Sequence, residues 1–375
     1  MRRIRLLLVI ILLPLLLMTL SCMPKKTQAT GAAARIETSW PVSSREAQGI
    51  DSGLLLEMLE DIREQHLGVH SVQIARNGVL VLDAYLPPFE EGERHNIYSC
   101  TKSIMSILIG IALDKGYIES LDQRVLDFFP ERAVENLTEE KERLTLRHLL
   151  TMSTGLDSRD SYLYRWAGLT RMRTSNDWVG HILDLPMAAE PGSRFDYSNL
   201  ASHLLSAIIT QTTGKSALDF GREHLFDPMG ITDIAWPTDR PVSSIGNAAM
   251  RVSPRDTNEN NTGWGDMELL APDLAKIGQL VLNDGQWDGR RIISSDYLKA
   301  ATAPQIQVEN SQFHYGFQWW IYEEGIPTAL GWGGQYLIVN PVGNLVVVFT
   351  SDLDEGSFYQ PYNLFSTYIL PSLIK

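Results

Sequence analysis

The chain has 375 residues, of which 44% are hydrophobic and 21% are charged, and its formal net charge is −13 at pH 7. This composition excludes disordered and fibrous proteins, and the length fits one large enzyme domain as well as two smaller domains. Because the acidic chain would repel a phosphate backbone, nucleic acid is not an expected partner. With only two cysteines, the sequence predicts neither a disulfide framework nor a cysteine-built zinc site.

The first 21 residues are typical of an export signal. Three arginines within the first five residues precede a largely apolar run, Leu6–Leu20, which at 15 residues is shorter than a membrane span. Cys22 comes directly after this run and Ser21, an arrangement that resembles the processing site of bacterial lipoproteins. Such sites usually have an aliphatic residue three places before the cysteine, where this chain has Thr19. We expect lipidation of Cys22, with plain cleavage or retention as an anchor as alternatives. Each outcome predicts an extracytoplasmic protein, either a periplasmic or cell-surface lipoprotein or a secreted protein, with membrane contact only through this segment.

A tether is expected at residues 22–37, followed by a mixed segment of helix and strand. Asp51 is suited to cap a helix whose apolar stripe ends at Ile62. Strand-like residues on either side of Asn77-Gly78 predict a tight hairpin. The C-terminal region shows strand patterns at 315–322, 335–340 and 345–350, and an amphipathic helical pattern at 363–370.

Helical patterns dominate the intervening region, at 102–115, 146–152, 200–213 and 272–282. Strands at both ends with helices between them favour one α+β domain over two domains in tandem. We expect one antiparallel sheet built from the N- and C-terminal segments, flanked by helices, with an inserted and mostly helical subdomain. This domain covers residues 38–375, with its α/β part at about 38–95 and 300–375 and its helical part at about 96–299.

Ser99 and Lys102 fall in the first turn of a helix that is predicted to be buried, because residues 107–113 are apolar on nearly every side. Residues three apart share a helix face, so the Lys102 amine can reach the Ser99 hydroxyl. Serine becomes a nucleophile when a base removes its proton, and a lysine acts as that base when burial disfavours its charged form. A helix start with an exposed lysine is the alternative, and Ser-x-x-Lys recurs at residues 372–375.

Tyr197 and Asn199 form the only Tyr-x-Asn in the sequence and precede a predicted helix. The phenol of Tyr197 can carry a proton between a nucleophile and a leaving group, and the Asn199 amide can hold Lys102 or a substrate carbonyl. A turn residue whose hydroxyl caps the next helix is the alternative for Tyr197.

A glycine-containing segment, Trp332-Gly333-Gly334-Gln335, leads into the strand predicted at 335–340. The glycines permit a close approach of backbone to ligand, and the backbone N–H groups of Gln335 and Ser99 are suited to form an oxyanion hole. Trp332 is a candidate substrate wall, or else a residue that packs on the sheet.

This order of motifs resembles the serine beta-lactamase and penicillin-binding-protein superfamily, and more narrowly its class C-like branch of esterases, D-aminopeptidases and 6-aminohexanoate-dimer hydrolases. The likeness runs from about Trp40 to the C-terminus. It also includes the segments His148–Leu156, Glu190–Gly192, Asp227–Gly230 and Leu274–Leu280. The resemblance implies a beta-lactamase-like α+β fold whose antiparallel sheet has five strands.

The resemblance also implies roles for the residues of the three motifs. Ser99 would be the acylated nucleophile, and Lys102 and Tyr197 would transfer its proton. Asn199 would be an orienting group. Residues 332–334 would form the third motif.

The third motif departs from the family, because penicillin-recognising members generally have Lys-Thr-Gly there, and Trp332 supplies no cation for a substrate carboxylate. We therefore expect a serine hydrolase that cleaves an ester or small amide through an acyl-enzyme on Ser99. A beta-lactamase or D,D-peptidase acting on cell-wall peptides is one alternative, and an inert protein that binds peptidoglycan or a partner is another. The expected partner is a small-molecule ester, amide or peptide, with no cofactor and no metal.

Other residues support weaker hypotheses. Cys100 is expected to be a small buried filler, since no adjacent residue offers its thiol a base. Four aromatic residues, Tyr162, Tyr164, Trp166 and Trp178, are suited either to shape an acyl pocket or to pack into the helical subdomain. The segments His314–Tyr315 and Asn258–Thr262 are candidates for a pocket rim.

Overall fold

The computed structural model of the chain describes residues 40–160, 166–236, 238, 260–322 and 325–374. Residues from Ser39 to Lys375 belong to one unit. The expected signal, the tether and Cys22 lie outside the described residues, as do Tyr162 and Tyr164. Within the described ranges, every helix is too short or too polar to cross a membrane.

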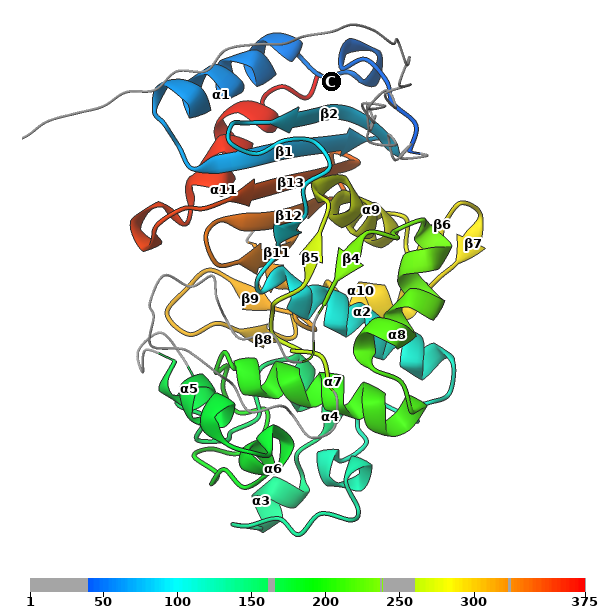
Figure 1. Ribbon diagram of the computed structural model, residues 1–375, viewed down its shortest axis with the longest axis vertical. Helices are drawn as coiled ribbons and strands as arrows, with labels where there is room; N and C mark the ends of the chain where they lie inside the picture. The colour runs from blue at the N-terminus through cyan, green and yellow to red at the C-terminus, as the bar shows by residue number, and fades with distance from the viewer. Residues whose placement is uncertain (1–39, 161–165, 237, 239–259, 323–324, 375) are drawn as a thin grey trace, which may run out of the picture. The chain divides into compact units, whose positions relative to one another are not determined.

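An antiparallel sheet with the strand order β2-β1-β13-β12-β11-β10-β9-β8 lies at the centre of the fold (Figure 1). Five of its strands are long enough to form the sheet that the resemblance implied, and three two-residue strands extend it. The long strands are β1 (Val69–Arg76), β2 (Val79–Tyr85), β11 (Pro327–Gly331), β12 (Gln335–Asn340) and β13 (Leu345–Ser351). The short strands are β8 (Ile306–Gln307), β9 (His314–Tyr315) and β10 (Trp320–Ile321).

The β1–β2 hairpin turns at Asn77 and Gly78, as its sequence predicts. Their φ angles are 55° and 80°, and both are positive because a two-residue turn of this kind reverses a twisted strand pair only in that conformation. The register then pairs Arg76 with Val79 on the hairpin, while β1 pairs on its other edge with β13. N- and C-terminal segments therefore share one sheet.

The prediction of one continuous strand at 315–322 is wrong. Pairing is confined to β9 and β10, and the chain turns between them at Gln318, whose φ is 62°. The Gln318 side chain donates to the carbonyls of Leu149 and Leu150 at 3.0 and 3.1 Å. The Gln318 amide therefore donates to carbonyl groups at the end of α4 that have no partner within that helix, and the backbone turns at Gln318 where a regular strand would continue.

The two faces of the sheet bury different side chains of the same strands. On β13, Val347 and Phe349 pack with helix α1 (Ser52–Glu64) and the C-terminal helices α11 (Gln360–Leu364) and η7 (Phe365–Ile369). Val346 and Val348 instead join the core beneath α2 (Cys100–Asp114) and α9 (Ala271–Leu282). Figure 1 shows α1 and α11 beside the β1–β2 end of the sheet. Asp51 caps α1 as expected, with its carboxylate 2.8 Å from the Gly53 N–H.

Between β2 and β8 the chain is mainly helical, and the green helices of Figure 1 lie away from the β1–β2 end. The remaining α-helices are α3 (Glu139–Glu142), α4 (Leu146–Leu150), α5 (Ala167–Thr174), α6 (Trp178–Leu183), α7 (Asn199–Thr213), α8 (Ala217–Gly221) and α10 (Ser295–Ala301). Single turns are η1 (Glu46–Gln48), η2 (Val125–Phe128), η4 (Arg222–Phe226), η5 (Asp227–Met229) and η6 (Glu355–Ser357). A small three-stranded sheet has the order β3 (His95–Asn96), β5 (Glu268–Leu269), β4 (Ile234–Ala235). A second small sheet pairs β6 (Gln286–Trp287) with β7 (Arg290–Arg291).

Candidate active site

Ser99 lies at the N-cap of α2, a helix that is buried along most of its length. All residues of α2 from Cys100 to Ala112 are buried, whereas Ser99 itself is partly exposed. Tyr98 precedes it with a φ of 46°, a left-handed conformation that non-glycine residues seldom adopt. The Tyr98 N–H donates to the Asn96 side chain at 2.8 Å, which holds this turn in place. The hydroxyl is thus fixed by a rigid helix and still open to a small molecule.

Lys102 is only 1% exposed, and its amine is surrounded by three oxygens. Its Nζ lies 3.0 Å from Ser99 Oγ, 2.7 Å from Asn199 Oδ1 and 2.9 Å from the Trp264 carbonyl oxygen. Burial lowers the pKa of Lys102 to about 7, and the negative charge of Asp160 only partly opposes this. The neutral amine is therefore well populated at physiological pH.

These contacts decide where the lone pair of the neutral amine points. The oxygens of Asn199 and Trp264 are carbonyl oxygens, which accept hydrogen bonds and donate none. Both N–H groups of a neutral Lys102 are used by these two acceptors. The remaining position on Nζ faces the Ser99 hydroxyl, so the lone pair is aimed at the proton that a base would have to remove.

Tyr197 lies on the other side of the Ser99–Lys102 pair. Lys102 Nζ is 5.0 Å from the centroid of its ring. Burial raises the pKa of the Tyr197 phenol above its ordinary value, with the Ser99 hydrogen bond opposing this, so the phenol keeps its proton near neutrality. Trp320 stacks on the ring at 6.0 Å and Trp166 meets its edge at 6.4 Å. The tyrosine is held by its aromatic body and leaves its hydroxyl for Ser99.

Asn199 begins α7 and presents its side-chain oxygen to Lys102. Ser198, not Tyr197, is the N-cap residue, since its Oγ accepts from the Ala201 N–H at 3.2 Å. The alternative in which Tyr197 caps the helix is therefore excluded by the geometry. The sequence predicts that the Asn199 amide holds either Lys102 or a substrate carbonyl, and in the structure it contacts Lys102.

A second contact of Asn199 was missed from the sequence. The Asp160 carboxylate is fully buried and accepts from the Asn199 N–H at 2.5 Å, from the Leu200 N–H at 3.2 Å and from Asn199 Nδ2 at 3.4 Å. Asp160 lies in a loop with no periodic pattern, and its partners follow 39 and 40 residues later. No local signal could have identified it.

The third motif closes the β11–β12 hairpin. Gly333 and Gly334 have φ angles of 74° and 86°, and a Cβ on Gly334 would lie 2.5 Å from a Leu353 methyl carbon. The Cys100 thiol donates to the Gln335 carbonyl at 3.6 Å, which puts the start of β12 beside the residue that follows Ser99. Trp332 is 41% exposed at this turn, so it does not pack into the sheet.

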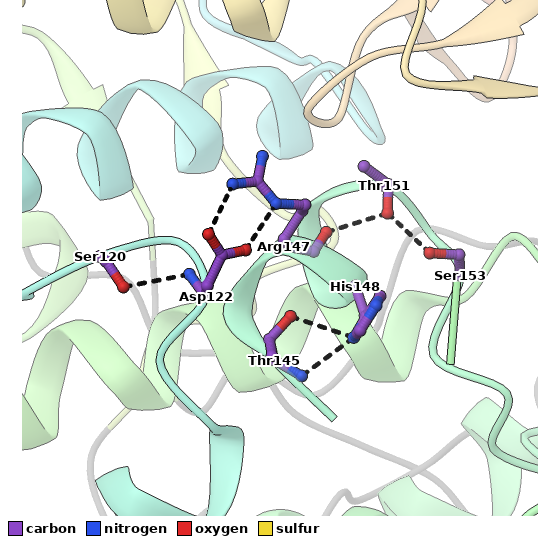
Figure 2. Close-up of polar contacts among 7 residues, drawn as sticks. All are labelled: Ser120, Asp122, Thr145, Arg147, His148, Thr151 and Ser153. Carbon is purple, nitrogen blue, oxygen red and sulfur yellow. Dashed lines mark hydrogen bonds and ion pairs between the residues drawn. The ribbon is translucent and has the colours of Figure 1, made fainter. Parts of the chain in front are cut away.

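The segment His148–Leu156 supports the loop that carries Tyr197. In Figure 2, Arg147 holds Asp122 with two hydrogen bonds of 2.8 and 3.1 Å, and His148 Nδ1 accepts from the Thr145 N–H at 3.0 Å to cap α4. Thr151 then bridges the Arg147 carbonyl and the Ser153 hydroxyl. Further along, the Met152 carbonyl accepts from the Asp196 N–H at 2.7 Å. This segment has a structural role, and it fixes the residue next to Tyr197.

The weaker candidates are structural. Trp178 is buried against His203 and Trp264, so it packs into the helical region. Tyr315 is buried against Phe195 and Trp320, so the proposed rim at 314–315 is wrong for this side chain. Within 260–262, the Thr262 hydroxyl donates to the Gly265 carbonyl at 2.7 Å, which shapes the loop that offers the Trp264 carbonyl to Lys102.

Cys100 has the properties of a filler residue. Its side chain is fully buried, and burial raises the pKa of the thiol above its ordinary value. Among the described residues, no group of three or more histidine, cysteine or acidic side chains is arranged to hold a metal ion.

An antiparallel sheet packed between helices, with a Ser-x-x-Lys pair at the start of a buried helix and a tyrosine facing the serine, defines the class of serine beta-lactamases and penicillin-binding proteins. The Beta-lactamase family model matches residues 55–365, and the chain belongs to this family.

Relatives of known name are distant in sequence. The 6-aminohexanoate-dimer hydrolase of Paenarthrobacter ureafaciens is 22% identical over 296 residues, which cover 73% of this chain and 70% of that protein. Beta-lactamase-like protein 4 of Dictyostelium discoideum is 24% identical over 242 residues, which cover 60% of this chain and 42% of that protein. The chain spans less than half the length of several of the curated relatives that it matches.

The fold is also similar to that of EstCE1, a hydrolase with promiscuous acyltransferase activity. The TM-score is 0.65 at 15% sequence identity, and the match covers 84% of this chain and 98% of the other. At this identity the similarity shows the fold alone.

Proposed function

We propose that this protein is a serine hydrolase that cleaves an ester or a small amide through an acyl-enzyme on Ser99. The observation that carries the proposal is the set of three contacts around Lys102, which leaves its lone pair for the Ser99 proton. A distant relative named as a 6-aminohexanoate-dimer hydrolase supports the same class of reaction.

The first half-reaction forms the acyl-enzyme. Ser99 Oγ attacks the carbonyl carbon while its proton passes to Lys102 Nζ, and the carbonyl oxygen becomes an oxyanion. The tetrahedral adduct then collapses and the bond to the leaving alcohol or amine breaks. The proton that Lys102 took from Ser99 passes through the Tyr197 hydroxyl to the leaving group, so that Lys102 is neutral again and Tyr197 keeps its proton. Tyr197 acts here in its protonated form, in keeping with its raised pKa.

The second half-reaction releases the acid. A water molecule attacks the acyl carbon and gives up a proton through the same two groups, and Ser99 Oγ leaves with a proton restored. We assign oxyanion stabilisation to the backbone N–H groups of Ser99 and Gln335, since the Cys100–Gln335 contact brings these two segments together.

The exposed side chain of Trp332 supports the proposed substrate class. Trp332 is exposed at the β11–β12 turn, where it offers an aromatic face and no charge. An uncharged ester or amide suits this surface better than a substrate that needs a cation for its carboxylate. We also propose that the protein is exported and lipidated on Cys22, on the basis of the sequence pattern, and intact mass of the mature N-terminus tests this.

The experiment that tests the proposal compares purified wild-type protein with Ser99→Ala on p-nitrophenyl acetate and butyrate. Wild-type turnover that disappears in Ser99→Ala supports the proposal, and turnover that persists removes Ser99 from the mechanism. Labelling of Ser99 by a fluorescent penicillin, seen by intact mass together with poor ester turnover, would favour a beta-lactamase or D,D-peptidase. A serine inert to a fluorophosphonate probe would favour a binding protein.

A further inference from the structure

Asp160 is a buried carboxylate whose hydrogen bonds lead to the candidate base in two steps. Its oxygens accept from the backbone N–H groups of Asn199 and Leu200, and Asn199 Nδ2 lies 3.4 Å from Asp160 Oδ1. The other end of the same amide, Asn199 Oδ1, accepts from Lys102 at 2.7 Å. The Asn199 amide therefore connects a buried acid with a buried base.

Asp160 determines which end of the Asn199 amide faces Lys102. An asparagine amide has an accepting end and a donating end, and the two can exchange by rotation. With Asp160 in place, the donating NH₂ faces the carboxylate and the accepting oxygen faces Lys102. In the rotated amide, the oxygen would face the ionised carboxylate, which is a repulsive contact. The NH₂ would face Lys102, where it would repel the charged amine or occupy the lone pair of the neutral amine.

We propose that Asp160 is a positioning residue for the reaction: it orients the Asn199 amide toward Lys102 and, by its charge, sets the pH above which Lys102 accepts the Ser99 proton. This inference rests on the proposed function for its catalytic meaning, but the Asp160–Lys102 coupling can be measured without turnover.

The charge of Asp160 also acts on Lys102. Burial raises the pKa of Asp160 to about 7, and its backbone hydrogen bonds with Asn199 and the charge of Lys102 act in the opposite direction. The charged groups that affect Lys102 come from several segments: Asp160 from its loop, Asp266 from the loop after Trp264, and Cys100 from α2. Tyr197 stays protonated beside it. Burial also raises the pKa of Cys100, so Asp160 and Asp266 are the acids that favour the charged lysine.

The negative charge of Asp160 determines the direction in which its removal should shift the titration midpoint of Lys102. Removing a negative charge near an amine disfavours its protonated form, so Asp160→Asn should lower the titration midpoint of Lys102. Two unit charges linked through one amide in a protein interior interact strongly enough to move the midpoint by on the order of one pH unit. The orientation effect should lower kcat and leave KM nearly unchanged, because the acid touches no substrate.

The experiment measures the Lys102 midpoint by NMR on full-length protein with ¹³C-labelled lysine, with Lys102 assigned by comparison with Lys102→Arg. Wild type is compared with Asp160→Asn and with Asp160→Ser, which keeps a capping oxygen for α7 if the first variant folds poorly. Ser198→Ala is the matched control, since it removes the other cap of the same helix and no charge.

The inference predicts a lower midpoint in both Asp160 variants and an unchanged midpoint in Ser198→Ala. Equal midpoints in all four proteins would overturn it, as would an equal fall in the control. The acid limb of kcat/KM for p-nitrophenyl butyrate should move to lower pH in the same variants. If wild type lacks turnover, the proposed function fails, and the NMR titration still decides whether Asp160 controls Lys102.

Discussion

Gln335 and Ser351 exchange two hydrogen bonds across the ends of β12 and β13. Gln335 Nε2 donates to the Ser351 carbonyl at 2.6 Å, and the Ser351 N–H donates to Gln335 Oε1 at 3.1 Å. The same Nε2 also donates to the Trp332 carbonyl at 3.0 Å. The side chain of Gln335 thus fixes the third motif against a central strand, while its backbone is the part proposed to meet the substrate.

Gln335→Glu should destabilise the protein, because a carboxylate would replace the donating NH₂ that faces two carbonyl oxygens. We expect a loss of about 1–3 kcal/mol in the free energy of unfolding, measured by urea denaturation. Gln305→Glu is the control, since Gln305 is exposed and donates to a single carbonyl. A loss no larger than that of the control would contradict the structural role assigned to Gln335.

Turnover should rise with pH through the range in which Lys102 loses its proton. The base must be neutral to accept the Ser99 proton, and burial lowers the pKa of Lys102 to about 7. The acid limb of kcat/KM should therefore have its midpoint near pH 7, well below the ordinary range of lysine. Stopped assays from pH 5 to 9 on one uncharged ester would measure it, and a limb centred above about pH 9 would point to a different base.

Lys102→Ala should reduce kcat by about a hundredfold to ten-thousandfold, the usual contribution of a general base. Lys102→Arg should be no better, since a guanidinium stays charged and has no lone pair to offer. Single-turnover acylation by a fluorophosphonate probe measures the loss directly. Acylation of Lys102→Arg at the wild-type rate would exclude the lysine as the base.

Tyr197→Phe should lower kcat by a similar factor while leaving the fold intact. The ring would keep its contacts with Trp320 and Trp166, and only the hydroxyl proposed to carry the proton would be lost. Tyr315→Phe is a suitable control, as Tyr315 packs on the same Trp320 without reaching Ser99. Equal activities of the two variants would argue against proton transfer through Tyr197.

Gly334→Ala should destabilise the hairpin more than Gly289→Ala. Both glycines have positive φ angles, 86° and 72°, but a Cβ at residue 334 meets Leu353 at 2.5 Å, whereas at residue 289 nothing lies within 4 Å. The backbone cost of about 1 kcal/mol is shared, and the steric cost belongs to Gly334 alone. Thermal unfolding of the two variants compares them, and equal losses would show that Leu353 moves aside freely.

Much of the fold follows from local patterns in the sequence. The Asn77-Gly78 turn, the cap at Asp51 and the limits of β12 and β13 could be predicted because neighbouring residues determine them. The strand expected at 315–322 failed because Gln318 is directed by α4, a helix more than 160 residues earlier. Tertiary hydrogen bonds of this kind leave no periodic signal.

The candidate site divides in the same way. Ser99 and Lys102 are three residues apart on one helix, so their contact could be predicted from helix geometry. Asp160 and the Trp264 carbonyl could not, because they reach Asn199 and Lys102 from separate loops. The role of the Gln335 side chain was also missed, since the sequence pattern drew attention to its backbone.

The position of β13 has a consequence for biosynthesis. Val72 pairs with Phe349, so the N-terminal hairpin obtains its inner neighbour only from the last strand to be translated. Contacts of such high sequence separation form late, and the half-made polypeptide has an open sheet edge until the ribosome has nearly finished. A nascent chain of this topology therefore remains unfolded for longer than one whose sheet closes early.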